Sequence, residues 1–218
     1  AVTDDEGSFS FEDRLWSKSR AGSDLLLTTS VQDKEISMQV KLSDVSLEPI
    51  RYRPLPSKVG GLKKHEISID GTWKLNVSPG PTFLQEPLTG KEWADFTVPG
   101  QWKQQGFEIP QDKAVAMARE FTIPKKWEGY RIILRFDAIH AGTNYWLNGK
   151  KLGYSENLFT PVEWDITDQA MPGKKNRLDL EMKVETVSEK LSYSSGYAFH
   201  SLGGIDRSVR LFALPRVN

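Results

Sequence analysis

The side chains that most often perform hydrolysis are few and scattered in this chain. Only three histidines are available as bases, His65, His140 and His200, and they lie far apart in the sequence. No Gly-x-Ser-x-Gly turn, which would present a serine nucleophile, occurs. His140 follows an apolar strand pattern, so we predict a core or turn role for it. Cysteine is absent, which excludes thiolate zinc sites, disulfides and cysteine nucleophiles together.

Metal and phosphate sites are not predicted either. The chain has no His-x-x-x-His or Asp-x-Asp-x-Asp-Gly spacing, and Gly203-Gly204 leads into a strand pattern rather than a helix. Glycoside hydrolysis needs two carboxylates roughly 5 to 10 Å apart. Among 29 acidic residues some pair meets that spacing by chance, so their abundance indicates nothing. We predict no cofactor and no metal.

Size and charge narrow the class of protein. With 218 residues the chain is long enough for one β-rich domain with additions, or for two small domains. Lys plus Arg and Asp plus Glu both number 29, so the basic excess typical of nucleic-acid binding is missing. No apolar run approaches the roughly 20 residues that span a bilayer. The polar, acidic start is unlike a signal peptide, as expected for a cytoplasmic chain or one whose leader has been removed.

The clearest local pattern is an Asn-Gly pair between two apolar runs, at Asn148 and Gly149. A type I′ turn needs positive φ at both central residues, which this pair supplies at low cost. Other segments alternate apolar and polar residues, the pattern of strands with one buried face. The runs with this pattern are 71–77, 131–138, 178–185 and 209–214. Helical turns are considered only near 115–119 and 167–171. The sequence therefore predicts an all-β sandwich or barrel.

Residues 1–64 differ from the remainder. Two strands are predicted at 25–31 and 36–42, and Pro and Gly residues mark a connector over 54–64. We predict two parts, residues 1–64 and a sandwich over 65–218. The first part is interpreted as a β-rich extension lying on the sandwich, with a separate preceding module as the alternative.

Five segments in order carry a resemblance that covers about Ile67 to Pro215. They are Val98–Trp102, Arg119–Gly129, Thr143–Tyr154, Phe159–Thr167 and Gly203–Val209. In this order and spacing the chain resembles the N-terminal sugar-binding domain of glycoside hydrolase family 2, which includes β-galactosidases, β-glucuronidases and β-mannosidases. The resemblance implies an antiparallel jelly-roll β-sandwich of the galactose-binding-domain type.

The resemblance also implies where catalysis takes place. In family 2 enzymes both catalytic glutamates lie on a TIM barrel that follows this domain, after an immunoglobulin-like domain. A barrel needs roughly 250 residues, and this sequence ends at Asn218 just after the sandwich. We therefore expect this chain to contain no catalytic residues and its parent protein to be a glycoside hydrolase. Its expected partners are a carbohydrate and those two downstream domains. The periplasm or cell exterior is the expected location, with the cytoplasm as the alternative.

Site residues follow from the family pattern. Family members use an amide residue before the Trp of the Pro-x-x-Trp segment to contact sugar, and Gln101 holds that place here, with loop bonding as the alternative. Trp102 is expected to pack in the core. β-Galactosidases add an Asp from the loop before Gly-Ile-x-Arg-x-Val, but that position is Ala198 here, which argues against galactose specificity. Tyr197 and His200 of that loop are the substitutes we predict.

Three further residues are assigned structural roles. Arg207 matches an Arg of the family pattern and is expected to brace a carboxylate or loop carbonyls, while Asn148 and Gly149 serve the turn. Two other functions remain open, a stand-alone carbohydrate-binding module and a ligand-free interaction sandwich. A stand-alone module would need an exposed aromatic platform, for which Trp146 and Trp164 are available.

Overall fold

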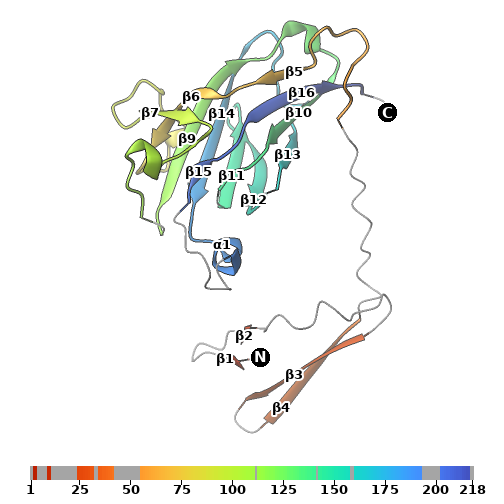
Figure 1. Cartoon of the computed structure of the whole chain (residues 1–218), viewed down its shortest axis with the longest axis vertical. Coiled ribbons are helices and arrows are strands. Elements are labelled where there is room, and N and C mark those ends of the chain that lie inside the picture. The colour runs from red at the N-terminus through yellow and green to blue at the C-terminus, as the bar shows by residue number, and fades with distance from the viewer. Residues whose placement is uncertain are drawn as a thin grey trace. The chain divides into compact units, whose positions relative to one another are not determined.

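A computed structural model describes two compact units, Ala1–Pro54 and Leu55–Asn218 (Figure 1). In the first unit the described residues are 2–3, 9–10, 24–31 and 34–41; in the second they are 55–110, 112–140, 142–157, 160–192 and 202–216.

The first unit contains two antiparallel pairs. Strand β1 (Val2–Thr3) pairs with β2 (Phe9–Ser10), and β3 (Asp24–Val31) pairs with β4 (Lys34–Lys41). Val31 lies opposite Lys34, so β3 and β4 form a hairpin. Both strands predicted from the sequence in this unit are confirmed, with β4 beginning two residues earlier than predicted.

The second unit is an antiparallel β-sandwich, as predicted (Figure 1). One sheet has the order β12-β11-β14-β9-β6-β7, and its strands are Lys150–Ser155, Gly142–Leu147, Lys175–Lys183, Ala114–Thr122, Gly71–Asn76 and Ala94–Val98. The other has the order β13-β10-β16-β5, with strands Val162–Asp165, Arg131–Phe136, Val209–Leu214 and Glu66–Ser68. A two-stranded pair joins β8 (Gly100–Gln101) to β15 (Gly204–Ile205).

Helices are few and short in the described part of this unit. One α-helix, α1 (Val187–Ser192), follows β14. Three 3₁₀ turns lie at Phe83–Gln85, Lys103–Gln105 and Lys125–Trp127. No helix in the described ranges is long and apolar enough to cross a membrane.

The core between the two large sheets is built from the apolar face of each alternating strand. Leu134 and Phe136 of β10, and Leu178 and Leu180 of β14, are all fully buried. Trp73 of β6 packs edge-on to Phe136 with ring centroids 6.5 Å apart. The predicted core faces of these strands are confirmed.

Two local predictions are wrong. Val77, expected to continue the buried face of β6, is 46% exposed because the strand ends at Asn76. Residues 115–119 form no helical turn. They lie in β9, where Val115 to Ala118 are all buried because both faces of the sheet are covered there. At 166–170 a single turn forms, with the Ala170 N–H donating to the Ile166 carbonyl at 2.8 Å.

The segment 77–93 covers part of the outer face of the six-stranded sheet. Phe83 and Trp93 from this segment pack on Ala116 and Ala118 of β9 and on Trp146 of β11. Arg177 of β14 fastens it by donating to the carbonyls of Glu86 and Phe83, at 2.5 and 3.0 Å. The charged face predicted for β14 is therefore not fully solvated.

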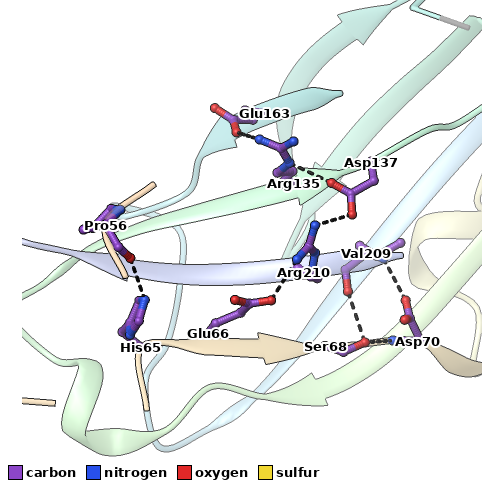
Figure 2. Close-up of polar contacts among 10 residues, drawn as sticks. All are labelled: Pro56, His65, Glu66, Ser68, Asp70, Arg135, Asp137, Glu163, Val209 and Arg210. Atoms are coloured by element: carbon purple, nitrogen blue, oxygen red, sulfur yellow. Dashed lines mark hydrogen bonds and ion pairs between the residues drawn. The ribbon is translucent and has the colours of Figure 1, made fainter. Parts of the chain in front are cut away.

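Residues 55–65, here called the N-terminal strap, pack against the second unit. Leu55 lies on the outer apolar group Ile133, Phe212 and Leu214 of the four-stranded sheet. The Tyr130 hydroxyl donates to the Gly60 carbonyl at 2.8 Å, and the Trp127 indole to the Lys64 carbonyl at 3.0 Å. His65 Nε2 lies 2.9 Å from the Pro56 carbonyl (Figure 2). The stretch predicted as a connector is thus folded onto the sandwich.

A ladder of charges crosses all four strands beside that apolar group (Figure 2). Arg135 contacts Glu163 at 2.8 Å and Asp137 at 2.7 Å. Arg210 contacts Asp137 at 2.5 Å and Glu66 at 3.0 Å. Opposite charges therefore alternate along the row and neutralise one another, so its role is to hold the strands in register.

The hairpin between β11 and β12 has the predicted turn. Asn148 and Gly149 have φ of 52° and 77°, as a type I′ turn requires. The Asn148 amide also donates to the Gln169 carbonyl at 2.9 Å and to Asn176 Oδ1 at 3.0 Å. This side chain therefore ties the turn to the loop before β14.

Candidate functional site

Three segments distant in sequence meet at one end of the sandwich. Gly204 of β15 lies opposite Gln101 of β8 and, on its other side, forms a bridge with His140. The Gly204 N–H and the His140 carbonyl are 2.9 Å apart, as are the His140 N–H and the Gly204 carbonyl. Gln101 and His140 thus flank a residue without a side chain.

Glycine is required at this junction for steric reasons. A Cβ on Gly203 would overlap the indole of Trp102, and the backbone N–H of Trp102 donates to the Gly203 carbonyl at 3.0 Å. Gly204 has a φ of 136°, and a Cβ there would overlap the Gly100 carbonyl. The Gly-Gly pair therefore allows β15 to approach β8 closely, which sets the place of Gln101.

The space beside Gly204 contains the carboxylate of Asp206. The Gln101 carboxamide and the His140 side chain lie close enough to Asp206 to influence the pKa of its carboxyl. Burial raises the pKa of the Asp206 carboxyl, against the opposing effects of Gln101, His140 and Arg207. Burial also lowers the pKa of the His140 imidazole, although the Asp206 charge opposes it. The site is therefore a desolvated group of one amide, one imidazole and one carboxyl.

Asp206 has a buried oxygen with an unfilled hydrogen-bonding capacity. Among the described residues, Asp206 Oδ1 is shielded from solvent and has no hydrogen-bond partner. A buried acceptor without a partner costs stability, typically about 1–3 kcal/mol, more for charged groups. A buried polar atom without a partner calls for an explanation, and because this one lies beside Gln101 we take the junction as the candidate site.

The predicted site residues are distributed as follows. Gln101 lies at this junction, half-buried. Trp102 is 3% exposed and belongs to the main core. Arg207 is exposed, its backbone N–H donates to the Ala138 carbonyl at 3.4 Å, and its charge reaches Asp206. Tyr197 and His200, the predicted loop contacts, lie outside the described residues, so both stay predictions.

Two members of the group were not selected from the sequence. His140 was assigned to the core or a turn, and its ring is indeed almost fully buried. Asp206 lies inside the Gly203–Val209 segment, but nothing singled it out. One feature of the sequence could have identified Asp206. It is an acidic residue directly after Gly-Gly-Ile, at the start of an apolar strand, where packing alone would favour an apolar side chain.

A second depression lies where β10 and β13 meet the turn after them, with a volume of about 390 Å³. It is open and polar, and Arg131 and Asp165 occupy it as an ion pair at 2.6 Å. Burial opposes ionisation of Asp165, but hydrogen bonds from Thr167 and Arg131 outweigh burial and lower its pKa. Ligand pockets are usually lined by apolar groups with a few polar ones, so we do not assign a ligand to it. Its lining residues are Arg131, Asp165, Thr167, Asp168, Gln169 and Arg216.

The chemistry open to the Gln101 group is recognition by hydrogen bonds. An amide both donates and accepts, which suits a hydroxyl-rich ligand. Within the part of the chain that the structure describes, no group of three or more His, Asp or Glu side chains is arranged to hold a metal ion.

Comparison with known proteins gives a family match for part of the β-sandwich. Residues 109–215 match the model of the glycosyl hydrolases family 2 sugar binding domain. The resemblance to the family 2 sugar-binding domain that the five sequence segments predicted is therefore confirmed.

The similar curated proteins are named as β-galactosidases. The enzyme of Halalkalibacterium halodurans is 28% identical over 69% of this chain, which corresponds to 17% of that protein. The enzyme of Streptococcus thermophilus is 24% identical over 88% of this chain and 21% of that protein. The chain thus spans about a fifth or less of the length of these relatives, so any activity of a whole enzyme is a matter for proposal.

Solved structures show the same fold. A β-glucuronidase from an uncultured Clostridium sp. superposes with a TM-score of 0.57 at 22% identity, covering 69% of this chain and 29% of that one. A family 2 member from Bacteroides cellulosilyticus gives a TM-score of 0.56 at 19% identity, covering 70% of this chain and 21% of that one.

Proposed function

We propose that this chain is the non-catalytic sugar-binding domain of a family 2 glycoside hydrolase. In this role it braces a catalytic barrel elsewhere in the same polypeptide and contributes contacts at the edge of the sugar pocket. The hydrolysed bond is an O-glycosidic bond of a carbohydrate. Gln101 is the residue that we assign to the sugar contact, because its carboxamide lies at the site formed by β8 and β15.

The observation that carries the proposal is the match of residues 109–215 to the family's sugar-binding domain, within relatives of which the chain spans 17%. The half-buried amide of Gln101 supports an edge contact, since an amide in a binding site discriminates between ligands that complete its hydrogen bonds and ligands that do not.

A stand-alone carbohydrate-binding module is less well supported. Such a module needs an exposed aromatic platform, but Trp146 packs on Phe83 with centroids 5.8 Å apart, and Trp164 packs on Tyr145 at 5.1 Å. Among the described large apolar side chains, Tyr154 is the one clearly exposed aromatic, at 50%. Its hydroxyl donates to Glu156 Oε1 at 2.6 Å. A ligand-free interaction sandwich gives no reason for the shielded, unpartnered Asp206 Oδ1 beside Gln101.

The test compares this chain with the complete translation product of its gene. Both are assayed for turnover of aryl β-galactoside and aryl β-glucuronide, and both are titrated with the corresponding free sugars by calorimetry. We expect turnover and measurable sugar affinity from the complete product only. In that product, Gln101→Ala should lower kcat/KM roughly 10-fold or more, since a hydrogen bond to substrate is lost.

Gln104→Ala is the matched control, because Gln104 is exposed on the adjacent 3₁₀ turn and should not affect kinetics. Turnover by the 218-residue chain alone would refute the non-catalytic role. Sugar binding by this chain as tight as by the complete product would refute the shared pocket. A gene product with no further chain would refute the bracing role.

A further inference from the structure

We infer that Gln105 is a positioning residue that holds the segment 97–105, and with it Gln101, in place beside β15. This inference rests on the proposed sugar contact of Gln101 and adds a residue that acts through it. Two geometric features lead to it: a two-point hydrogen bond made by the Gln105 carboxamide, and the packing of that carboxamide on Gly100.

The Gln105 carboxamide binds both backbone polar groups of one residue. Its Oε1 accepts from the Thr97 N–H at 2.8 Å, and its Nε2 donates to the Thr97 carbonyl at 2.9 Å. Thr97 lies in β7, which among the described strands is at the edge of the six-stranded sheet. The carboxamide therefore occupies the place that a further strand would take. Because its donor and its acceptor are both engaged, the amide is fixed in distance and in orientation.

This pair of hydrogen bonds closes a short segment around Gln101. Gln105 and Thr97 are separated by 8 positions in the sequence, and Gln101 stands midway between them. The Trp102 carbonyl accepts from the Gln105 N–H at 3.0 Å and from the Phe107 N–H at 2.9 Å. The segment is therefore held at its first residue by the side chain of Gln105 and in its second half by backbone bonds.

Gly100 allows the carboxamide to reach this position. A Cβ on Gly100 would overlap Gln105 Nε2 and the Thr97 carbonyl. The amide thus lies directly against the backbone that precedes Gln101. The hydrogen-bonding edge of the same strand, β8, pairs with β15. Gln105 and β15 are therefore two separate supports for the backbone that carries Gln101.

Gln101 needs the second support because the first one is short. β8 and β15 contain two residues each, and Gln101 is only half-buried. A side chain that contacts substrate has to be held within a fraction of an ångström by its neighbours. Both hydrogen bonds of Gln105 lie at the exposed surface, outside the core. Their loss should therefore displace Gln101 without unfolding the sandwich.

The first experiment observes Gln101 in the 218-residue chain, without ligand. Amide hydrogen exchange and backbone ¹⁵N relaxation are compared between the native chain and Gln105→Met, which keeps the length of the side chain and removes both hydrogen bonds. The Thr97 amide should exchange roughly 5- to 10-fold faster, the effect of one hydrogen bond. The ¹⁵N order parameter of Gln101 should fall from about 0.85 towards about 0.6, the range of flexible backbone. Gln105→Ala is a second variant and should give the same two changes.

Gln104→Met is the matched control, because Gln104 is the neighbouring glutamine and is exposed. It should change neither the Thr97 exchange rate nor the Gln101 order parameter. An unchanged Thr97 amide in the Gln105 variants would refute the contact. A faster Thr97 amide with a native order parameter at Gln101 would refute the positioning role, since Gln105 would then support β7 alone. These readouts need neither sugar nor turnover, so they do not depend on the proposed function.

The second experiment is a double-mutant cycle in the complete gene product. Gln105→Met should lower kcat/KM roughly 3- to 10-fold, since a small displacement of a substrate contact slows the reaction, and by no more than Gln101→Ala does. In the Gln101→Ala background the same substitution should change kcat/KM less than about 2-fold, because Gln105 acts through Gln101. Equal losses in both backgrounds would refute the positioning role and leave the proposed function intact. If Gln101→Ala itself leaves kcat/KM unchanged, the sugar contact in the proposed function is wrong, and the relaxation data alone decide whether Gln105 holds Gln101.

Discussion

The buried ion pair beneath the segment 77–93 makes a measurable prediction about stability. Asp179 of β14 is 1% exposed and lies 2.8 Å from Arg177. Its second oxygen, Oδ2, has no hydrogen-bond partner among the described residues. Burial raises the pKa of Asp179 from 3.8 to about 6, although Arg177 opposes the shift. Desolvation of this carboxylate therefore outweighs its attraction to the arginine.

The sign of the pH dependence follows from that shift. Because the fold raises the pKa of Asp179, the folded state binds this proton more tightly than the unfolded chain does. The contribution to stability is fully present below pH 3.8 and is lost as the pH rises through about 6. A shift of about 2 pKa units corresponds to about 3 kcal/mol. Asp179→Asn imitates the protonated form and should remove this dependence.

The assay is urea unfolding of the native chain and Asp179→Asn between pH 4 and pH 7.5. At pH 7.5 the variant should be more stable by up to about 3 kcal/mol, and near pH 4 the two should converge. Arg177 keeps its bonds to the Phe83 and Glu86 carbonyls in the variant, and the asparagine oxygen can replace the lost acceptor.

Asp95→Asn is the control for Asp179→Asn, since the Asp95 side chain is 70% exposed in its pair with Lys74. It should leave the pH dependence unchanged. A variant at position 179 that is less stable than the native chain at pH 7.5 would show that the Arg177 attraction wins, and the reasoning would fail.

Three further predictions concern packing. Second-unit chains that begin at residue 65 should be at least about 2 kcal/mol less stable than chains that begin at residue 55, because removing the N-terminal strap exposes the apolar surface beneath it. Urea unfolding compares the two chains, and equal unfolding midpoints would refute the stabilising role of the strap. Asn148→Ala should cost about 1–3 kcal/mol, since it strains a positive φ and removes side-chain bonds; the matched surface change Lys150→Ala should not. Gly203→Ala should displace Trp102 and lower the free energy of unfolding by about 1–3 kcal/mol through overpacking. The readouts are a changed tryptophan fluorescence spectrum and a lower thermal midpoint. An unaltered spectrum would contradict the close approach of β15 to β8.

Local patterns predicted the strands well where one face is buried and the other is solvated. In β10 the predicted core face of Ile132, Leu134 and Phe136 matches the observed one, although Ile133 on the opposite face is also covered, by Leu55. The Asn148-Gly149 turn was equally accessible, because its conformation depends on two adjacent residues only.

Prediction failed where a second layer covers the sheet. β9 has no clean alternation because Ala116 and Ala118 face the segment 77–93 rather than solvent. A strand buried on both faces looks like a buried helix in sequence, and short apolar runs do not distinguish the two. Asp179 of β14 was predicted to face solvent, and this prediction is wrong because a second layer also covers that part of the sheet.

The candidate site could be predicted only in part because its members come from three distant segments. Gln101 was found through the family pattern of the segment that carries it. His140 and Asp206 come close to Gln101 because Gly204 pairs with both β8 and His140. A local sequence pattern does not predict such a pairing between distant segments.

The place of β16 has a consequence for how the domain is made. This last strand lies between β10 and β5 in the four-stranded sheet, so Arg210 pairs with Arg135 on one side and with Ser68 on the other. During synthesis from the N-terminus, β10 and β5 therefore each keep one edge of unpaired backbone N–H and C=O groups until the strand between them has left the ribosome. Charged side chains on such edges discourage pairing with a neighbouring chain. Arg135 and Glu66 are charged residues on the two edges that β16 later occupies.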